Sequence, residues 1–327
     1  MSSTATVVGA TERPTQRRWL SIAVIWLALA TAPTWLPFLG GYTALASKVL
    51  VFGLAAMGLN LLLGFTGVLS FGHAAYFGLG AYGAGLVLKY VMPSTSLAIL
   101  AGILFGGLAG TLFGALIMRR RGVYFAMCTI AFGQIFYYIA YSWNDFTGGF
   151  DGLRGFHREP IGFAPVDFDI TDGTRFYYFT LVVFAMAVAL MGLLVRSPFG
   201  RSLRAIRENE RRARFLGIPV EQHIWLSFSI SCFFTALAGA LYALLNNFAD
   251  PLALHYSLSG YFVIMAVMGG MRSFWGPLVG AVVFVVLQDY ISSMTVNWMS
   301  FVGLIFMLVV LFFPRGMLGM LKRRGVE

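Results

Sequence analysis

Charged residues are scarce in this chain of 327 residues, because Asp, Glu, Lys and Arg together make up only 11% of it. Soluble domains carry about 25% charged residues, so the composition argues against a soluble fold. Apolar residues make up 59%, and stretches such as 97–118, 176–195 and 224–245 approach or reach the roughly 20 apolar residues that a membrane-spanning helix needs. The sequence therefore predicts an all-α polytopic membrane protein.

Motifs for nucleotide binding, metal binding and hydrolysis are also missing. The chain has no Gly-x-x-x-x-Gly-Lys-Ser/Thr loop, no His-Glu-x-x-His pair and no Gly-x-Ser-x-Gly turn, which would hold phosphate, zinc or a nucleophilic serine. Its two cysteines, Cys128 and Cys232, lie far apart in apolar segments, so neither a disulfide framework nor a metal site is predicted. We expect a non-catalytic chain without a cofactor or metal of its own. Any ATP and magnesium that power it would be bound by partner subunits.

Apolar runs and the residues that break them predict ten membrane spans. The expected spans are about 19–37, 44–64, 69–91, 97–118, 123–142, 176–195, 224–245, 258–271, 277–293 and 299–313. Eighteen of the 23 Lys and Arg residues then lie on the same side as both termini, which the positive-inside rule assigns to the cytoplasm. Short basic clusters between spans set orientation, so the net charge of +10 does not indicate nucleic-acid binding.

The same charge pattern divides the chain into segments. Residues 1–18 and 315–327 are predicted as cytoplasmic tails, and 19–314 as a single transmembrane domain. The first apolar run suits an uncleaved first helix better than a cleaved signal peptide. The acidic loop 143–175 is predicted to lie outside the membrane on the far side, and the arginine-rich loop 196–223 on the cytoplasmic side.

Two of the predicted spans are interrupted or short. The third contains five glycines, and the eighth ends in Gly269-Gly270. The segments Gly67-Val-Leu-Ser-Phe-Gly72 and Gly270-Met-Arg-Ser-Phe-Trp-Gly276 resemble each other, which indicates either an internal duplication or two similar glycine-rich turns. Interrupted helices at membrane depth are typical of transporters, because freed backbone groups can bind a polar substrate there.

Small and polar residues inside the spans indicate helix packing more strongly than a role in transport. The fourth span carries a small residue every four positions, at Gly102, Gly106, Gly110 and Gly114. Such a stripe lets another helix approach closely. Ser70 is predicted as the N-cap of the third span, while His73 either faces a permeation path or satisfies backbone groups at the helix start. Asn60 and Gln134 either hydrogen-bond across helices or line the path.

The inner loop contains an arginine-rich segment, residues 200–218, with apolar residues at near-helical spacing. Those residues are Leu203, Ile206, Ala213 and Leu216. The pattern predicts one short amphipathic helix that ends at Gly217 and Pro219. Composition leaves three roles open for it: binding anionic lipid, forming a solvated loop, or docking into a groove on a cytoplasmic partner.

Several motifs in order along the chain carry a resemblance to a known family. They include Gly58-Leu-Asn-Leu-Leu-Leu-Gly64, the adjoining Gly67-Val-Leu-Ser-Phe-Gly-His-Ala-Ala-Tyr76, Arg121-Gly-Val-Tyr-Phe-Ala126, and the loop from Gly200 to Ile218. With these motifs the chain resembles the membrane permeases of branched-chain-amino-acid-type ABC importers, the LivH/LivM family, and more closely the LivM branch. The resemblance covers most of the chain from residue 45 to 315.

The resemblance implies a permease subunit in a bacterial inner membrane. It also implies a second homologous permease, two ATPase subunits and a periplasmic substrate-binding protein as partners. The inner loop would be the helix that couples to the ATPases, through Gly200, Arg201, Arg204, Ala205, Arg207, Glu208, Asn209, Ala213 and Gly217. The candidate residues of the translocation path are Asn60, Ser70, His73, Gln134 and Gly270. The matching periplasmic residues are Thr147, Gly148, Gly149 and Asp151.

Two points stay open at this stage. Many relatives have Glu where this chain has Gln134, and the family handles amides and organic acids as well as branched-chain amino acids, so the resemblance does not identify the substrate. A stand-alone secondary transporter or channel remains the alternative. The scarcity of buried Asp, Glu and Arg argues against it, because ion-coupled transporters use such residues as carriers.

Overall fold

Long apolar helices dominate the computed structural model, which describes residues 25–163, 166–312 and 316–318. Among these residues, six helices are long and apolar enough to cross a membrane. They are α3 (Thr43–Leu63), α5 (Thr95–Ile117), α6 (Val123–Ser142), α8 (Gly173–Arg196), α11 (Val220–Asn246) and α13 (Gly276–Met294). Each coincides with one predicted span to within a few residues at either end. The prediction of a helical protein with many spans is confirmed in that form.

Shorter helices occupy three further predicted spans. They are α4 (His73–Leu86) with the π-helical turn η2 (Val87–Val91), α12 (Tyr256–Gly269) and α14 (Trp298–Phe312). The remaining small elements are α2 (Ala32–Trp35), η1 (Pro37–Leu39), α7 (Asn144–Thr147), η3 (Gly149–Asp151), α9 (Pro198–Glu208), α10 (Glu210–Phe215) and η4 (Pro251–Leu254). Part of the first predicted span and most of both predicted tails lie outside the described residues. The count of ten spans therefore stays a prediction.

The centre of the molecule is formed by α3, α4 and α11. In α3, 94% of the most apolar stretch is buried, against 22% in α6 and 33% in α5, α8 and α13. Helix α4 is buried from His73 to Gly85. A helix that is apolar on all sides is one that other helices surround, so the more exposed helices form an outer layer around this centre.

The glycine stripe of α5 packs against that centre, as predicted. A Cβ atom at Gly102 would lie 2.5 Å from the carbonyl oxygen of Gly80, and one at Gly106 would lie 2.6 Å from that of Tyr76. Both carbonyls belong to α4, so the two helices meet backbone to backbone. Side chains larger than hydrogen cannot fit between them.

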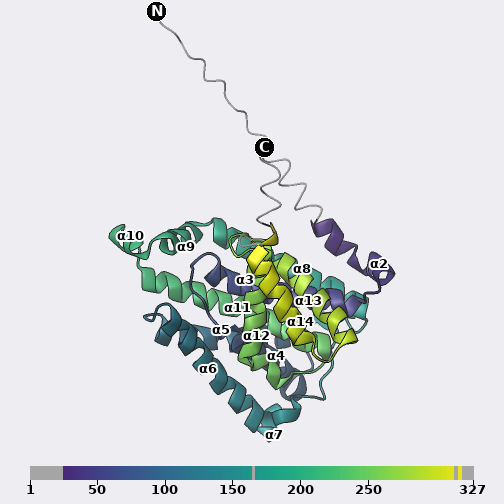
Figure 1. Cartoon of the computed structure of the whole chain (residues 1–327). Coiled ribbons are helices and arrows are strands. Elements are labelled where there is room, and N and C mark those ends of the chain that lie inside the picture. The colour runs from purple at the N-terminus through teal and green to yellow at the C-terminus, as the bar shows by residue number, and fades with distance from the viewer. Residues whose placement is uncertain (1–24, 164–165, 313–315, 319–327) are drawn as a thin grey trace, which may run out of the picture.

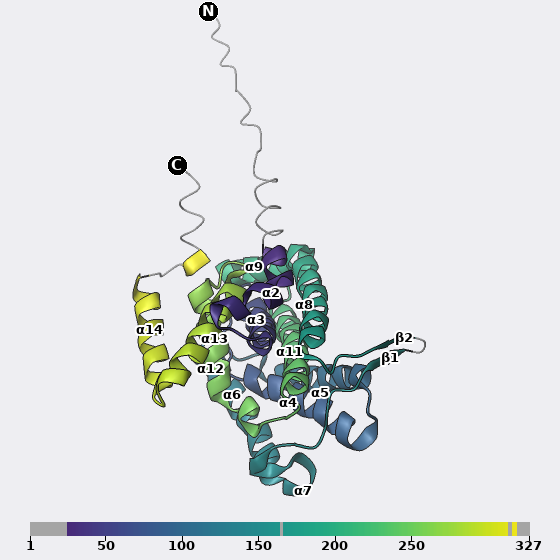
Figure 2. The ribbon, with the colours of Figure 1, turned by 90° about the vertical axis from the view of Figure 1, so that its right-hand side faces the viewer.

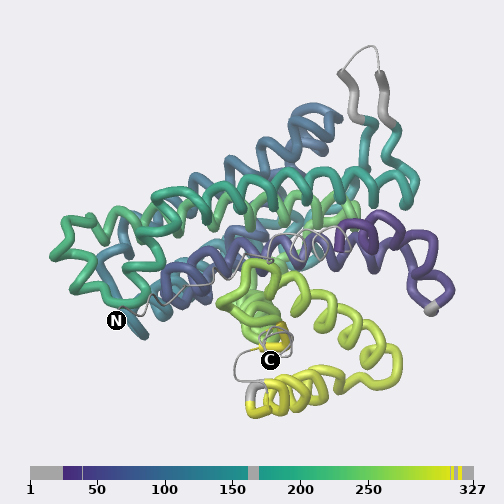
Figure 3. The backbone as a smooth tube through the Cα atoms, turned by 90° about the horizontal axis from the view of Figure 1, so that it is seen from above, coloured from purple at the N-terminus to yellow at the C-terminus, as the bar shows by residue number. Residues whose placement is uncertain are grey.

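Connecting segments gather at two opposite ends of the long helices. Helices α9 and α10 lie beyond one end, and α7 lies at the far end of α6 (Figure 1). From above, the chain near residues 200–215 is at the left and the chain near residues 40 and 170 at the right (Figure 3). We call the first the arginine-rich end, defined by residues 64–72, 118–122 and 197–219. The second is the hairpin end, defined by residues 36–42 and 143–172.

Within the predicted outer loop 143–175, β1 (Ile161–Phe163) and β2 (Val166–Phe168) pair antiparallel and project away from the helices (Figure 2). Two local predictions are corrected by the structure. The third span begins at His73 rather than near residue 69, so its N-cap residue is Gly72, not Ser70. The inner loop forms two helices, α9 and α10, instead of one.

Candidate functional site

The arginine-rich loop folds into two short helices because each has its own N-cap. The Ser197 hydroxyl accepts a hydrogen bond from the Gly200 backbone N–H at 3.3 Å, and Pro198 occupies the first turn of α9. The Asn209 side chain accepts one from Arg212 N–H at 2.9 Å and caps α10. Asn209 itself is extended, with φ −159° and ψ 102°. That conformation ends α9 and turns the chain before α10 begins.

The two helices bury their apolar residues against the membrane helices. Leu203 packs with Leu61 and Phe65, at the end of α3 and just beyond it. Ile206 and Ala213 form a second cluster with Val220 and Ile224 of α11, and Val68 packs against it. The predicted amphipathic character is confirmed for Leu203, Ile206 and Ala213. Leu216 is the exception, because 73% of it is exposed.

Two interruptions separate consecutive helices: the first, residues 64–72, lies between α3 and α4, and the second, residues 270–275, between α12 and α13. Arg207 joins α9 to the first interruption. Its guanidinium donates a hydrogen bond to the carbonyl oxygen of Gly64, and its Cγ would lie 3.0 Å from a Cβ added at Gly67. Burial lowers the pKa of Arg207, and the like charge of Arg272 lowers it further. Arg272 belongs to the second interruption, so the side chain of Arg207 lies close to both.

The two interruptions also touch each other. A Cβ added at Gly64 would lie 2.3 Å from the carbonyl oxygen of Met271, and the Asn60 amide donates a hydrogen bond to the Ser273 carbonyl at 3.4 Å. Gly316 adds a third segment, because its Cβ would lie 2.3 Å from the Cα of Gly270. At the arginine-rich end, α9 and residues 64–72 therefore meet residues 270–275 and, through these, Gly316.

Four ionic side chains tie α10 to the starts of α6 and α11. Arg121 lies 3.1 Å from Glu210 and 3.9 Å from Glu221. Arg214 lies 2.8 Å from Glu210 and 2.7 Å from Glu221. All four are partly exposed, and exposed pairs contribute only about 0–1 kcal/mol each. Each arginine pairs with both glutamates, so the four side chains form a closed ring. This ring fixes the position of α10 and adds little to the stability of the fold.

The predicted path residues do not form one cluster. Ser70 and His73 lie together, with 2.9 Å between the hydroxyl and imidazole Nδ1. Asn60 and Gly270 lie at the second interruption. Gln134 is on α6, where its Nε2 is buried with no hydrogen-bond partner in the described part of the chain.

His73 is enclosed by hydrogen bonds whose directions can be worked out. The Ser231 hydroxyl donates to the Gly58 carbonyl at 2.5 Å, so its single hydrogen is used and it accepts from His73 Nε2 at 2.7 Å. Nδ1 of the neutral ring then accepts from the Ser70 hydroxyl, which in turn accepts from Gly72 N–H at 3.3 Å. A neutral imidazole satisfies every group in this chain. The partners of the ring are the hydroxyls of Ser70 and Ser231 rather than backbone groups, so both predictions for His73 stay predictions.

Comparison with known proteins identifies the family. The family described as the permease component of branched-chain amino acid transport systems matches residues 41–311. The chain belongs to this family. Similar relatives include the high-affinity branched-chain amino acid permease LivM of Salmonella typhimurium, 27% identical over 93% of this chain and 74% of the relative, and LivM of Escherichia coli, 26% identical over 92% and 75%. The D-allose permease AlsC of E. coli is 30% identical over 67% of this chain and 62% of its own length. No solved structure matches the chain.

The family match covers both interruptions and the arginine-rich loop of this permease. It also covers the predicted outer residues Thr147, Gly148, Gly149 and Asp151. The Thr147 hydroxyl lies 2.6 Å from both the Ala140 and the Trp143 carbonyl oxygen, which share its single hydrogen. Gly148 and Gly149 adopt φ of 80° and 53°. These three residues close a tight turn after α6, and Asp151 is exposed beside it. The geometry shows a structural use for this motif.

Two exposed residues of the permease were missed as candidates. Phe215 is 91% exposed and Leu216 73% exposed, at the tip of α10. Asn209, Glu210, Arg211 and Arg214 line a hollow of about 420 Å³ on the same helix. A new helix begins after Asn209, so the apolar spacing of α9 does not continue into α10. Phe215 and Leu216 therefore face away from the membrane helices. An Asn followed by Glu is the capping signal that would have shown this.

Proposed function

We propose that this chain is the membrane-spanning permease subunit of an ATP-driven importer for branched-chain amino acids or a related small organic solute. Its relatives are named for branched-chain amino acid and D-allose transport, so the substrate class differs within this group. The proposed partners are a second permease, two ATPase subunits and a periplasmic binding protein. The proposed location is a bacterial inner membrane, with ten spans, both termini and the arginine-rich end on the cytoplasmic side.

The observation that carries the proposal is the way α9 and α10 sit on both interruptions. The inner side of this helix pair is fixed by Leu203, Ile206 and the hydrogen bond from Arg207 to Gly64. Its outer tip presents Phe215 and Leu216 among arginines. An exposed aromatic anchor surrounded by polar groups is typical of a residue that binds a pocket on a partner.

Movement of the ATPases would reach the permease through these contacts. Nucleotide-driven closure would displace α10, and the Arg121–Glu210 and Arg214–Glu221 pairs would pass the displacement to the starts of α6 and α11. Arg207 would pass it to the turn after α3. Helices packed backbone to backbone shift as rigid bodies, so a small movement at this end can open or close a path between them.

The first test separates docking from transmission. Phe215→Asp is expected to abolish co-purification of the ATPases, because a charged carboxylate replaces the exposed ring. Val296→Asp is the matched control, since Val296 is 94% exposed but follows the end of α13 at Met294 instead of lying on α10. Full ATPase recovery with Phe215→Asp would count against α10 as the docking element.

The second test addresses transmission. Arg207→Ala is expected to leave the ATPases bound while substrate-stimulated ATP hydrolysis and uptake in proteoliposomes fall, because the link to Gly64 is lost. Arg196→Ala is the control, since Arg196 is exposed in the last turn of α8 and is not among the predicted coupling residues. Uptake that continues without ATP and collapses with an ion gradient would replace this proposal with a secondary transporter.

A further inference from the structure

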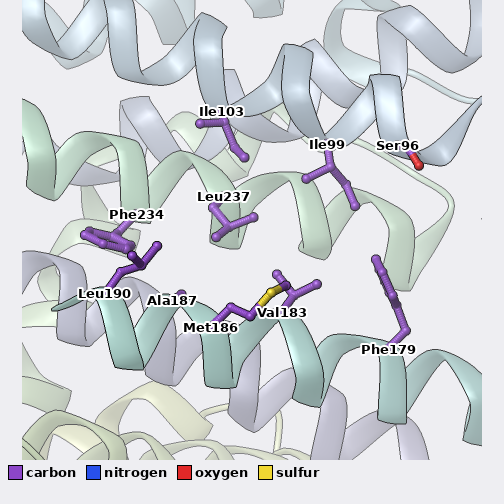
Figure 4. A pocket seen from close by; sticks show the side chains of 10 residues that line it. All are labelled: Ser96, Ile99, Ile103, Phe179, Val183, Met186, Ala187, Leu190, Phe234 and Leu237. Carbon is purple, nitrogen blue, oxygen red and sulfur yellow. The ribbon is translucent and has the colours of Figure 1, made fainter. Parts of the chain in front are cut away.

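An apolar groove runs along the outside of the helices, between α5 and α8. Its volume is about 380 Å³. Ile99 and Ile103 of α5 form one wall and Val183 and Met186 of α8 the other, while Phe234 and Leu237 of α11 form the floor. Their side chains point toward one another across the groove (Figure 4).

The groove is open on the outer surface of the membrane-spanning helices. On its rim Met186 is 55% exposed and Leu190 58% exposed, and both α5 and α8 are long and apolar enough to cross a membrane. On the α8 side it extends from Phe179 to Leu190, which is about 16 Å at 1.5 Å per residue. One leaflet of the hydrocarbon core is about 15 Å deep, so the groove has the length of one leaflet.

A half-buried arginine lies at the end of the groove nearest the hairpin. The Arg158 guanidinium lies 4.6 Å from the centre of the Phe176 ring. The centres of the Phe176 and Phe179 rings are 6.3 Å apart, and Phe179 lines the groove. On the opposite wall, the Thr95 hydroxyl donates to the Glu159 carbonyl at 2.6 Å. Residues 158 and 159 therefore cross the mouth of the groove from one wall to the other.

The charges at this mouth are mixed. Burial lowers the pKa of Arg158, the neighbouring Asp172 carboxylate acts in the opposite direction, and an arginine remains charged in either case. Asp172 also accepts hydrogen bonds from the backbone N–H groups of Thr174 and Arg175 and so caps α8. Glu159 adds a second carboxylate next to Arg158 in the chain. A headgroup that carries both a phosphate and an ammonium complements this set better than a purely anionic one.

We propose that the groove binds an acyl chain of a zwitterionic phospholipid such as phosphatidylethanolamine, with the lipid phosphate on Arg158. The apolar walls keep water away from the acyl chain, and a guanidinium binds phosphate through charge-assisted hydrogen bonds. The inference rests on the membrane location of the chain, and not on its coupling to ATPases. A bound lipid in this position would fill the space between α5 and α8 and hold them at a fixed separation.

Photolabelling of the full-length chain in nanodiscs tests the proposal. The probe is phosphatidylethanolamine with a photoactivatable group on one acyl chain, in a bilayer of phosphatidylethanolamine and phosphatidylglycerol. We expect label on peptides that contain Ile103 and Met186. Val183→Trp fills the groove and is expected to lower this labelling about ten-fold. Val182→Trp, at a neighbouring position that is 57% exposed, is expected to leave it unchanged.

A second pair of variants tests the headgroup without altering the packed helices. Arg158→Gln is expected to weaken labelling by phosphatidylethanolamine about ten-fold, the equivalent of about 1.4 kcal/mol, and to leave labelling by a photoactivatable diacylglycerol unchanged. Arg154→Gln is the control, because Arg154 lies in the same loop but 5.3 Å from the ring of Phe248.

Three results would overturn the proposal. Equal labelling of Val183→Trp and Val182→Trp would mean contact with bulk lipid only. Equal loss of both probes in Arg158→Gln would remove the phosphate contact. Cross-linking of Met186 to a second permease chain, with loss of lipid label, would show that a protein fills the groove.

Discussion

The two interruptions of the spans, residues 64–72 and 270–275, look alike in sequence but are held by different interactions. Both contain glycine in the left-handed region, with φ of 78° at Gly67 and 112° at Gly270. Both are followed by a helix that packs closely on a neighbour. A Cβ at Gly80 would lie 2.1 Å from the Ala236 carbonyl oxygen, and one at Gly280 1.8 Å from that of Met265. The glycines thus have parallel uses in the two halves.

Side-chain hydrogen bonds from other helices hold the first interruption. Thr66 shares a hydrogen bond with Ser227 at 2.9 Å, and Phe71 N–H donates to the Thr129 hydroxyl at 3.1 Å. Ala74 N–H donates to the Ser259 hydroxyl at 2.7 Å. The bonds from Phe71 and Ala74 satisfy backbone N–H groups that the missing helical turn leaves free, and the Thr66–Ser227 bond joins two side chains across helices.

Close backbone packing holds the second interruption. Ser273 N–H donates to the Gly270 carbonyl at 2.9 Å and Gly276 N–H to that of Ser273 at 3.3 Å, so the loop satisfies part of its own backbone. A Cβ at Gly269 would lie 1.7 Å from the Gly276 carbonyl oxygen. The comparison teaches that similar glycine-rich motifs can share a backbone path while the side chains that stabilise them differ. Each half should therefore respond to a different kind of substitution.

The largest expected effect is on the second interruption. Gly280→Ala places a methyl group against the Met265 backbone, so α12 and α13 must separate. Overpacking costs about 1–3 kcal/mol and occasionally more, and a backbone contact puts this variant at the upper end. The measurement is the thermal unfolding midpoint in detergent. Gly303→Ala is the control, because nothing lies within 4 Å of its added Cβ. Equal midpoints for the two variants would contradict the packing argument.

The next effect is on the first interruption. His73→Ala leaves the Ser70 hydroxyl without its acceptor and opens a cavity between α4 and α11. Leaving a buried polar group unsatisfied costs about 1–3 kcal/mol. We expect a destabilisation of about 2 kcal/mol in denaturant unfolding, with His157→Ala, at an exposed position, as the control. An unchanged stability would show that the Ser70–His73–Ser231 chain does not hold this helix start.

The sequence was informative about these regions to unequal degrees. Helices such as α6 and α11 could be predicted because an uninterrupted apolar run of membrane length allows few alternatives. The glycines of both interruptions could be identified because only glycine permits such close approach. The partner of His73 could not, since Ser231 lies 158 residues further along the chain and no local pattern relates the two.

The arginine-rich loop shows a different limit. Apolar periodicity predicts its buried residues Leu203, Ile206 and Ala213, but the same periodicity predicts a single helix that continues across Asn209. The capping geometry at Asn209 resets the phase, which exposes Leu216. A local hydrogen bond therefore overrode the apolar pattern. The functional roles of the predicted coupling and path residues stay predictions.

A smaller effect is expected where α9 meets the first interruption. Arg207→Met keeps most of the side-chain volume but removes the donor to the Gly64 carbonyl. Because the guanidinium is only partly buried, we expect a loss of about 1 kcal/mol, within the range of a typical hydrogen bond. Arg201→Met is the control, since Arg201 is exposed on the same helix and its side chain does not bond the Gly64 carbonyl. A loss above that of His73→Ala would mean that α9, not the buried chain, mainly holds the interruption.

The smallest effect is expected at Asn60, and it gives the sharpest contrast with His73. Both are polar residues buried beside an interruption, but Asn60 makes one long hydrogen bond of 3.4 Å to Ser273 and its Oδ1 has no partner among the described residues. The cost of losing one partner comes from leaving the other unsatisfied, and the Ser273 carbonyl still accepts from Gly276 N–H at 3.3 Å. Asn60→Leu should therefore change the unfolding free energy by less than about 1 kcal/mol in either direction. A loss as large as that of His73→Ala would mean that the second interruption also depends on side-chain hydrogen bonds, and that the two halves are stabilised alike.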